Sequence, residues 1–258
     1  MGVLNVTPDS FSDGGLYLDV DAAVAHGLEM IEQGADVIDV GGASTRPGSE
    51  QPSADEETRR VVPVIERLAA DGRARVSIDT MSGSVAAAAV AAGATLINDV
   101  SASLWEVAAA TRAGWVAMHM QGNPSTMQQA PHYNDVTAEV ASYLGERVAV
   151  AQAAGVTEVW IDPGIGFGKT VDHNLQLLGD LDRFVATGMP VVVGLSRKSF
   201  LGTLTPEADG TVPGPADRLE ASIAGAVWAV IKGVGMVRVH DVRATVAAVR
   251  IVCEEVGD

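Results

Sequence analysis

Polar and charged side chains stand at or just beyond the ends of a series of short apolar runs in this chain. They are Asn5, Asp79, Asn98, Asp162, Lys198, Arg238 and His240. Any one of them has a simpler explanation, such as a helix N-cap or a polar group satisfied within the core. Burying all of them without a ligand or partners is costly, so together they indicate a binding site.

The chemistry of these residues falls into two classes. Asp79, Asn98 and Asp162 offer carboxylate and amide groups, which suit the edge of a flat heterocycle with an amino-pyrimidine face. The second class is cationic or potentially cationic and consists of Arg46, Lys198, Arg238 and His240. Gathered in one place, such groups would hold phosphate oxygens, and an arginine can bind two at once. Taken alone, Arg46 is equally well explained as a solvated loop arginine.

The elements that would position these residues are short apolar runs rich in β-branched side chains. The runs cover residues 3–5, 37–40, 76–79, 96–99, 115–119, 159–162, 191–194 and 236–240. Amphipathic stretches of helical period fall between most of them, including 20–33, 56–70 and 136–154. Glycines stand where these helices should end, at positions that need a left-handed residue. These glycines are Gly34, Gly93, Gly155 and Gly188.

Alternating strands and helices predict an α/β fold with parallel strands and right-handed crossovers. We predict a (β/α)8 TIM barrel spanning residues 1–258 as a single domain, because a closed ring is the simplest way to bury eight strands. In a barrel the polar strand ends meet at one mouth, where such enzymes keep their active sites. A doubly wound open sheet fits the same polar ends, but no Gly-rich dinucleotide turn is evident. Residues 203–216, rich in Gly and Pro, are expected to form a long surface loop.

Composition and charge limit the classes of molecule that the protein is expected to bind. The chain has 33 acidic and 17 basic residues, a formal net charge of −16, which disfavours nucleic acid and anionic membranes as partners. A small anionic ligand remains compatible with cations that converge on one site. The single cysteine, Cys253, excludes an intrachain disulfide and is expected to be a packing residue. The sequence shows neither an export signal nor a membrane-spanning run, so we expect a cytoplasmic protein.

Several segments resemble the signatures of the dihydropteroate synthase family. The first is MGVLNVTPDSFSDGG at residues 1–15, and the second is IDVGGASTRPG at residues 38–48. Other stretches similar to the family pattern are residues 77–80, 97–100, 162–169, 194–200 and 238–242. The resemblance runs in order from residue 1 to about residue 252, and motifs of this length are specific.

The resemblance implies a transferase of folate biosynthesis. It would join 6-hydroxymethyl-7,8-dihydropterin diphosphate to p-aminobenzoate and release pyrophosphate. The implied pterin pocket consists of Asp79, Asn98, Asp162 and Lys198, and the implied pyrophosphate ligands are Arg238 and His240. Asn5 would help to hold Mg²⁺ on the pyrophosphate. The groups implied to act in catalysis are Arg46, Lys198, Arg238 and His240.

The same resemblance implies a p-aminobenzoate site at the place that sulfonamides occupy. Its residues would be Phe11, Thr45, Arg46, Pro47, Phe167 and Ser199. In the family the loops after the first two strands close over the mouth. The family is usually dimeric, so a homodimer is expected; Trp228 would lie either at the dimer interface or in the core, and the sequence favours neither.

Two departures from the family pattern keep other functions open. Ala43 stands where the family commonly has Glu, and residues 101–106 replace a Gly-rich stretch that is usually longer. One alternative is therefore an inactive or weakly active paralogue that keeps the fold and binds pterins or sulfonamides without turnover. Another is a barrel that transfers methyl groups from a methylated folate to a corrinoid protein. The first loop and Ser196–Ser199 argue against the latter.

Overall fold

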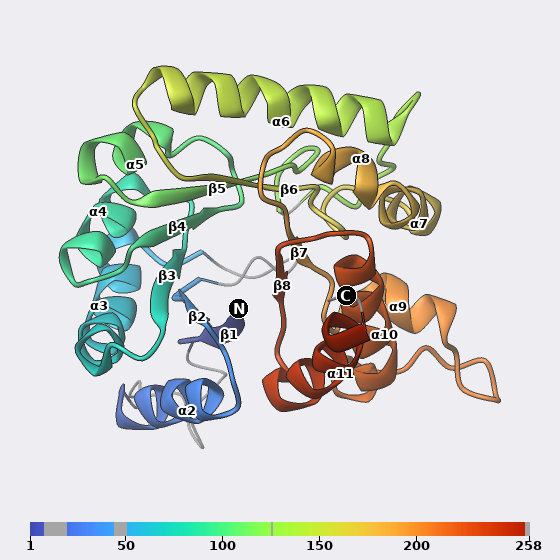
Figure 1. Ribbon diagram of the computed structural model, residues 1–258, viewed down its shortest axis with the longest axis horizontal. Coiled ribbons are helices and arrows are strands. Elements are labelled where there is room, and N and C mark those ends of the chain that lie inside the picture. Colours follow the sequence, from blue (N-terminus) through green and yellow to red (C-terminus); the bar gives the residue numbers. More distant parts are fainter. Residues whose placement is uncertain (8–19, 44–50, 125, 256–258) are drawn as a thin grey trace.

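A computed structural model describes residues 1–7, 20–43, 51–124 and 126–255, in which parallel strands lie at the centre and helices surround them (Figure 1). The strands are β1 Gly2–Asn5, β2 Val37–Gly41, β3 Arg75–Asp79, β4 Leu96–Asp99, β5 Gly114–Met118, β6 Val159–Asp162, β7 Val192–Gly194 and β8 Met236–Arg238. Each lies within two residues of its predicted bounds.

The helices follow the strands in alternation. They are α2 Val20–Glu32, α3 Ala54–Asp71, α4 Gly83–Ala91, α5 Trp105–Thr111, α6 Val136–Ala153, α7 Val171–Gly179, α8 Leu181–Val185, α9 Ser199–Leu204, α10 Leu219–Ile231 and α11 Val242–Glu255. The three helices expected from sequence periodicity are confirmed as α2, α3 and α6. The predicted glycine ends are confirmed by positive φ angles, as at Gly34 (101°) and Gly155 (93°), and likewise at Gly93 and Gly188.

The strands close into a barrel. Strands β1 to β6 pair in sequence order as one parallel sheet, and β7 pairs with β8. Single bridges between Ile161 and Val191 and between Gly2 and Val239 join the two sheets at both edges. At the second junction Val239 N donates to Met1 O at 3.0 Å. The predicted (β/α)8 architecture is therefore confirmed, and the open doubly wound sheet is excluded.

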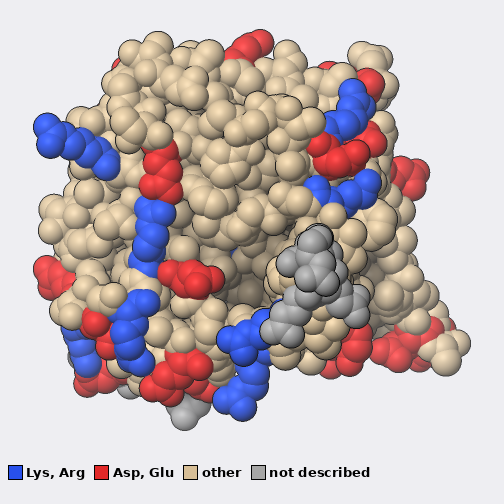
Figure 2. Space-filling model, in the orientation of Figure 1, with Lys and Arg blue, Asp and Glu red and all other residues tan. Residues whose placement is uncertain are grey.

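The core lies between the strands and the helices that cover them. Ile38, Ile78, Ile97 and Trp115 are fully buried. Apolar residues that line both faces of parallel strands explain why the runs in the sequence are nearly continuous. None of the described helices is long and apolar enough to cross a membrane. Figure 2, drawn in the orientation of Figure 1, shows acidic and basic side chains interspersed on this face.

Two expectations need correction, and one open alternative is decided. The stretch 203–216 is not one loop, because α9 continues to Leu204 and a 3-10 helix covers Pro215–Asp217. Cys253 is exposed near the end of α11, so it is no packing residue. Trp228 is 44% exposed on α10, which excludes the core as its environment. Cys253 and Trp228 lie on the outer surfaces of peripheral helices, where apolar character does not ensure burial.

Candidate active site

Strand register brings the predicted residues to one level of the barrel. Asn5 pairs with Gly41, Gly41 with Asp79, and Asp79 with Asn98, around four neighbouring strands. Gly194 pairs with Arg238 in the β7–β8 sheet. All these positions are at the carboxyl ends of their strands, so the polar ends form the mouth of the barrel as predicted.

Arg238 is the centre of the first polar network. Its Nε donates to Asp39 Oδ2 at 2.6 Å, and its Nη2 donates to Asp79 Oδ2 at 2.7 Å. Asn98 Nδ2 donates to the same Asp39 oxygen at 2.9 Å. The structure thus brings Asp79, Asn98 and Arg238 together around a fully buried carboxylate. Among the described residues, Asp39 Oδ1 has no hydrogen-bond partner.

One guanidinium donates to two carboxylates, and burial and these charges together determine the pKa values of Asp79 and Arg238. Burial raises the pKa of Asp79 to about 7; Arg238 opposes the rise, and Asp39 adds to it. Burial acts against the charge of Arg238, but Asp39 and Asp79 outweigh it and hold the pKa of Arg238 above its ordinary value. Arg238 therefore stays charged, whereas Asp79 exchanges its proton near neutral pH.

A second network joins the loops after β6 and β7. Asp162 Oδ1 accepts from Gly164 N at 2.7 Å, and burial raises the pKa of Asp162. Lys198 Nζ donates to the carbonyl oxygen of Ile165 and lies 4.3 Å from the centroid of the Phe167 ring. Burial lowers the pKa of Lys198 to about 8, with Asp162 opposing the shift. The charges of both networks act on Lys198, so they share one site.

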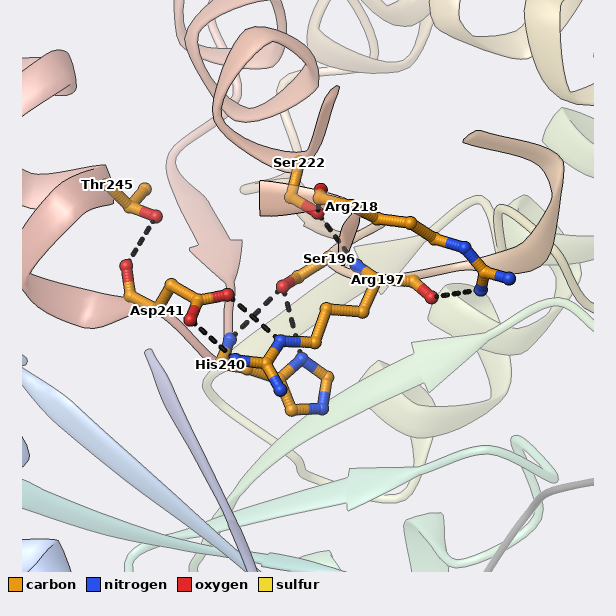
Figure 3. Close-up of polar contacts among 7 residues, drawn as sticks. All are labelled: Ser196, Arg197, Arg218, Ser222, His240, Asp241 and Thr245. Atoms are coloured by element: carbon orange, nitrogen blue, oxygen red, sulfur yellow. Dashed lines mark hydrogen bonds and ion pairs between the residues drawn. The ribbon is translucent and has the colours of Figure 1, made fainter. Parts of the chain in front are cut away.

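His240 belongs to a third cluster, shown in Figure 3. Ser196 Oγ accepts from His240 N at 3.2 Å and lies 3.1 Å from His240 Nδ1. Next to it, Arg197 Nη2 and Nε donate to the two carboxylate oxygens of Asp241 at 2.5 and 3.0 Å. Ser222 Oγ accepts from Arg197 N at 2.9 Å. These contacts join the loop after β7 to the loop after β8 and fix the backbone at His240.

A cleft of about 610 Å³ opens beside this cluster. Asn5, Arg197 and His240 line it, together with residues at the start of α11. The amide of Asn5 also faces the space above Gly41, because a Cβ on Gly41 would lie 3.7 Å from Asn5 Oδ1 and 3.8 Å from Asp79 Oδ2. The lining also includes His26 and Gln33, so the cleft runs from Asn5 and His240 at the ends of β1 and β8 to the helices α2 and α11. It contains both amide and cationic groups, which suits a phosphate-bearing ligand.

The predicted p-aminobenzoate residues are only partly within the described chain. Phe11, Thr45, Arg46 and Pro47 lie outside the described residues. Phe167 packs on Lys198, as above, and Ser199 is exposed at the first position of α9.

The two departures from the family pattern lie at the bases of loops. Next to Ala43, the carbonyl oxygen of Gly42 accepts from Arg60 Nη1 at 2.9 Å, so α3 holds the backbone at the end of β2. After β4, Asp99 accepts from Ser103 N and Leu104 N, each at 2.7 Å. Asp99 also accepts from Ser101 N at 2.9 Å and from Trp115 Nε1 at 3.1 Å. The altered stretch 101–106 is thus held by a buried carboxylate.

Sequence reasoning missed three buried polar residues of this site: Asp39, His119 and Lys169. Asp39 was part of an apolar run, and an acid inside such a run needs a buried partner, which was the available signal. Lys169 Nζ lies 3.0 Å from His119 Nδ1, and both lie in loops that follow strands. Nothing in the local sequence of either residue shows this pairing.

Known proteins share this arrangement. A family model described as "Pterin binding enzyme" matches residues 1–240. The dihydropteroate synthase of Mycobacterium leprae is 48% identical over 98% of this chain and 91% of its own length. The chain belongs to the dihydropteroate synthase family. The predicted family resemblance is confirmed, and with it the class of transferase enzyme.

Solved structures of dihydropteroate synthases superpose closely. The Xanthomonas albilineans dihydropteroate synthase with 4-aminobenzoic acid has a TM-score of 0.91, is 46% identical, and aligns with 100% of this chain and 92% of its own. The Yersinia pestis dihydropteroate synthase in complex with a sulfonamide drug has a TM-score of 0.91 and is 42% identical, with 98% and 92% covered. This member of the dihydropteroate synthase family therefore has the same fold as these two relatives over nearly its whole length.

Proposed function

We propose that this protein condenses 6-hydroxymethyl-7,8-dihydropterin diphosphate with p-aminobenzoate to give dihydropteroate and pyrophosphate, as a step of folate biosynthesis. The observation that carries the proposal is the convergence of Asp79, Asn98, Asp162, Lys198 and Arg238 on one barrel mouth, in a chain of this family. The whole chain, residues 1–258, acts as a single pterin-binding barrel domain in the cytoplasm.

The pterin ring binds deep in the mouth. Asp79 and Asp162 accept from the ring and amino N–H groups, while Asn98 offers both an amide oxygen and an N–H. Lys198 donates to a ring oxygen or nitrogen from the opposite loop, and its contact with the Phe167 ring limits where its ammonium lies. Because these groups are held by protein contacts before the ligand arrives, little ordering is needed on binding.

The diphosphate lies in the cleft lined by Asn5 and His240, and Arg238 binds it from the adjacent network with Asp39 and Asp79. Mg²⁺ would be held here by Asn5 Oδ1 together with phosphate oxygens, since Mg²⁺ usually takes only one or two protein oxygens. When bound, it supplies positive charge to the departing pyrophosphate. Arg238 and His240 hold the phosphate oxygens as negative charge develops on them.

p-Aminobenzoate enters from the loop side of the mouth, next to Phe167 and Ser199. Phe11, Thr45, Arg46 and Pro47 complete its site, and Arg46 assists catalysis from there. The 4-aminobenzoic acid and sulfonamide complexes of the two relatives support this ligand class for the present chain. Sulfonamides are therefore expected to compete with p-aminobenzoate.

The reaction requires no strong general base. The methylene–oxygen bond breaks, its electron pair leaves with pyrophosphate, and the pterin ring delocalises the resulting positive charge. The amine nitrogen then forms the C–N bond and loses a proton to water or pyrophosphate. Closing loops exclude water, which would otherwise trap the cation in place of the amine. Catalysis thus comes from positioning and charge rather than from a nucleophilic side chain.

Growth of a synthase-null strain tests the function in the cell. Expression of the protein is expected to restore growth without folate-pathway products. If soluble protein accumulates, binds the pterin diphosphate in calorimetry and still gives no growth, the chain is the inactive paralogue instead, with the alteration at Ala43 as the first place to seek the cause.

The role of Arg238 is tested separately by calorimetry. Arg238→Ala is expected to bind pterin diphosphate at least about tenfold more weakly, the loss of one charged hydrogen bond to phosphate. A pterin without the diphosphate loses less affinity, and only through the lost contact of Arg238 with Asp79. Arg183→Ala, which removes an exposed arginine of α8, is the control and changes neither affinity. Equal binding of the diphosphate by Arg238→Ala contradicts the assignment, provided that circular dichroism shows a folded variant.

We also propose a homodimer formed through α10. Trp228 and Ile231 on this helix are 44% and 56% exposed, which is unusual for large apolar side chains next to one another on one helix face. Lys232 Nζ covers part of the Trp228 ring at 5.3 Å, and the outer surface remains open to a second copy.

A further inference from the structure

Lys169 is a buried lysine that the proposed mechanism does not use. It follows the loop after β6 and precedes Thr170, the N-cap of α7, and its residue exposure is only 3%. A buried ammonium is costly unless its N–H groups find acceptors. Its surroundings should therefore show what it is placed to hold.

The Lys169 ammonium bridges two loops of the barrel mouth. Its Nζ lies 3.0 Å from His119 Nδ1, 3.0 Å from the carbonyl oxygen of Phe167 and 3.4 Å from the carbonyl oxygen of His119. Burial and the charge of Lys169 lower the pKa of His119 to about 3, so the imidazole is neutral and Nδ1 accepts. Donors and acceptors match, and the lysine joins the loop after β5 to the loop after β6.

The two loops touch so closely that only glycine fits between them. At Gly164, with φ +67°, a Cβ would lie 1.8 Å from the carbonyl oxygen of His119. At Gly168, with φ +61°, a Cβ would lie 2.5 Å from the carbonyl oxygen of Gln121. No side chain fits at Gly164 or Gly168 to hold the loop after β6. Lys169 holds it instead, through the contacts of its Nζ with His119 and with the carbonyl oxygen of Phe167.

The clamped loop carries parts of the proposed substrate site. Phe167, whose carbonyl oxygen accepts from Lys169, places its ring 4.3 Å from Lys198 Nζ. Gly164 N, at the other end of the loop, donates to Asp162 at 2.7 Å. The charged groups that act on Asp162 are Lys198, Lys169 and Arg238, and all three favour its ionised form. Burial lowers the pKa of Lys169 itself to about 7. Lys169 thus acts on Asp162 by charge below that pH, and on Phe167 by a hydrogen bond.

We infer that Lys169 is a positioning residue for the substrate pocket: it clamps the loop after β6 against the loop after β5, holds Phe167 over Lys198, and supports the negative charge of Asp162. The inference rests on the proposed function, because it assigns the loop a role in binding the pterin and p-aminobenzoate.

The test compares methionine variants of two lysines, Lys169 and Lys232, in the condensation assay. Lys169→Met is expected to raise the KM for p-aminobenzoate about tenfold, as for the loss of one charged hydrogen bond, with a smaller fall in kcat. Asp162 loses a nearby positive charge in this variant, so its pKa should rise. The affinity for pterin diphosphate should therefore fall at a higher pH than in wild type when the solution is made more acidic. Lys232→Met is the matched control, because this lysine directly follows α10 and pairs with Asp182 rather than with any residue of the proposed substrate site; it is expected to keep the wild-type KM and pH profile.

A second pair of variants covers the case in which Lys169→Met does not fold. His119→Phe keeps a ring but removes the Nδ1 acceptor, and is expected to raise the same KM. His119→Asn, whose amide oxygen takes the place of Nδ1, is expected to restore it. Folded Lys169→Met or His119→Phe with wild-type KM and pH profile, even at lowered thermal stability, overturns the inference and leaves Lys169 a structural residue only. A wild-type protein without turnover is a different failure, since it rejects the proposed function first.

Discussion

Arg238 donates to Asp39 and to Asp79, so one positive charge at the base of the mouth serves two carboxylates. The positions of Arg238 and Asp79 at strand ends could be predicted from the sequence, because polar residues there follow apolar runs. Their ion pair could not, since it joins residues 159 apart in the chain across the barrel. Asp39 was missed because it lies one layer deeper, where the run around it suggested only core.

Burial gives Asp79 a distinctive effect on stability, because it outweighs the opposing charge of Arg238. Asp79 holds its proton to about pH 7 in the folded protein but only to its ordinary value of 3.8 when unfolded. Its contribution is therefore fully present below pH 3.8, and the free energy of unfolding falls as pH rises through this window. Asp79→Asn keeps the hydrogen-bond acceptor for Arg238 and should flatten that fall. Urea unfolding at several pH values measures the free energy of unfolding of wild type and of Asp79→Asn. The same pH dependence in the two proteins would contradict the raised pKa of Asp79.

At the scale of elements, strands and most helices follow from periodicity and from the glycines that end them. The loops do not, because their shape depends on contacts between distant segments. The stretch after β4 is an example: Asp99 collects its backbone N–H groups and also accepts from Trp115 in the next strand. The sequence showed only that this loop departs from the family pattern, not that a carboxylate organises it.

Two left-handed glycines allow the loop after β6 to be tested against a matched control. Gly155→Ala, at φ +93° with open space around the new Cβ, should cost only about 1 kcal/mol of unfolding free energy from backbone strain. Gly164→Ala adds a clash with the carbonyl oxygen of His119 and should cost several times that, since backbone must move. Denaturant unfolding measures both. Equal losses would show that the two loops are not held in contact as described.

At the scale of the whole molecule, the barrel could be predicted because eight alternating units leave few ways to bury every strand. The closure itself rests on short contacts, such as the bridge from Gly2 to Val239, which no local pattern reveals. The net charge of −16 makes the few cations at the mouth the natural attractors for an anionic substrate. Outer helix surfaces were the least predictable part, as Trp228 and Cys253 show.

The proposed dimer belongs to this scale. Ile231→Asp places a charge within the exposed apolar face of α10 and should convert a species of twice the chain mass into one of a single chain. Val150→Asp, an equivalent change on α6, should leave the mass unchanged. Light scattering after size-exclusion chromatography gives both masses. A wild-type protein that elutes as a single chain at high concentration would rule the dimer out.

Condensation at the barrel mouth is tested most directly by a single-turnover reaction, with enzyme in excess over labelled p-aminobenzoate in the presence of pterin diphosphate and Mg²⁺. Pyrophosphate release alone is insufficient, because water attack on the pterin cation would also release it. We expect the label to appear in dihydropteroate at the same rate as pyrophosphate is released. Bound pterin diphosphate with no labelled dihydropteroate, or pyrophosphate released without labelled dihydropteroate, would show that the protein does not catalyse the condensation.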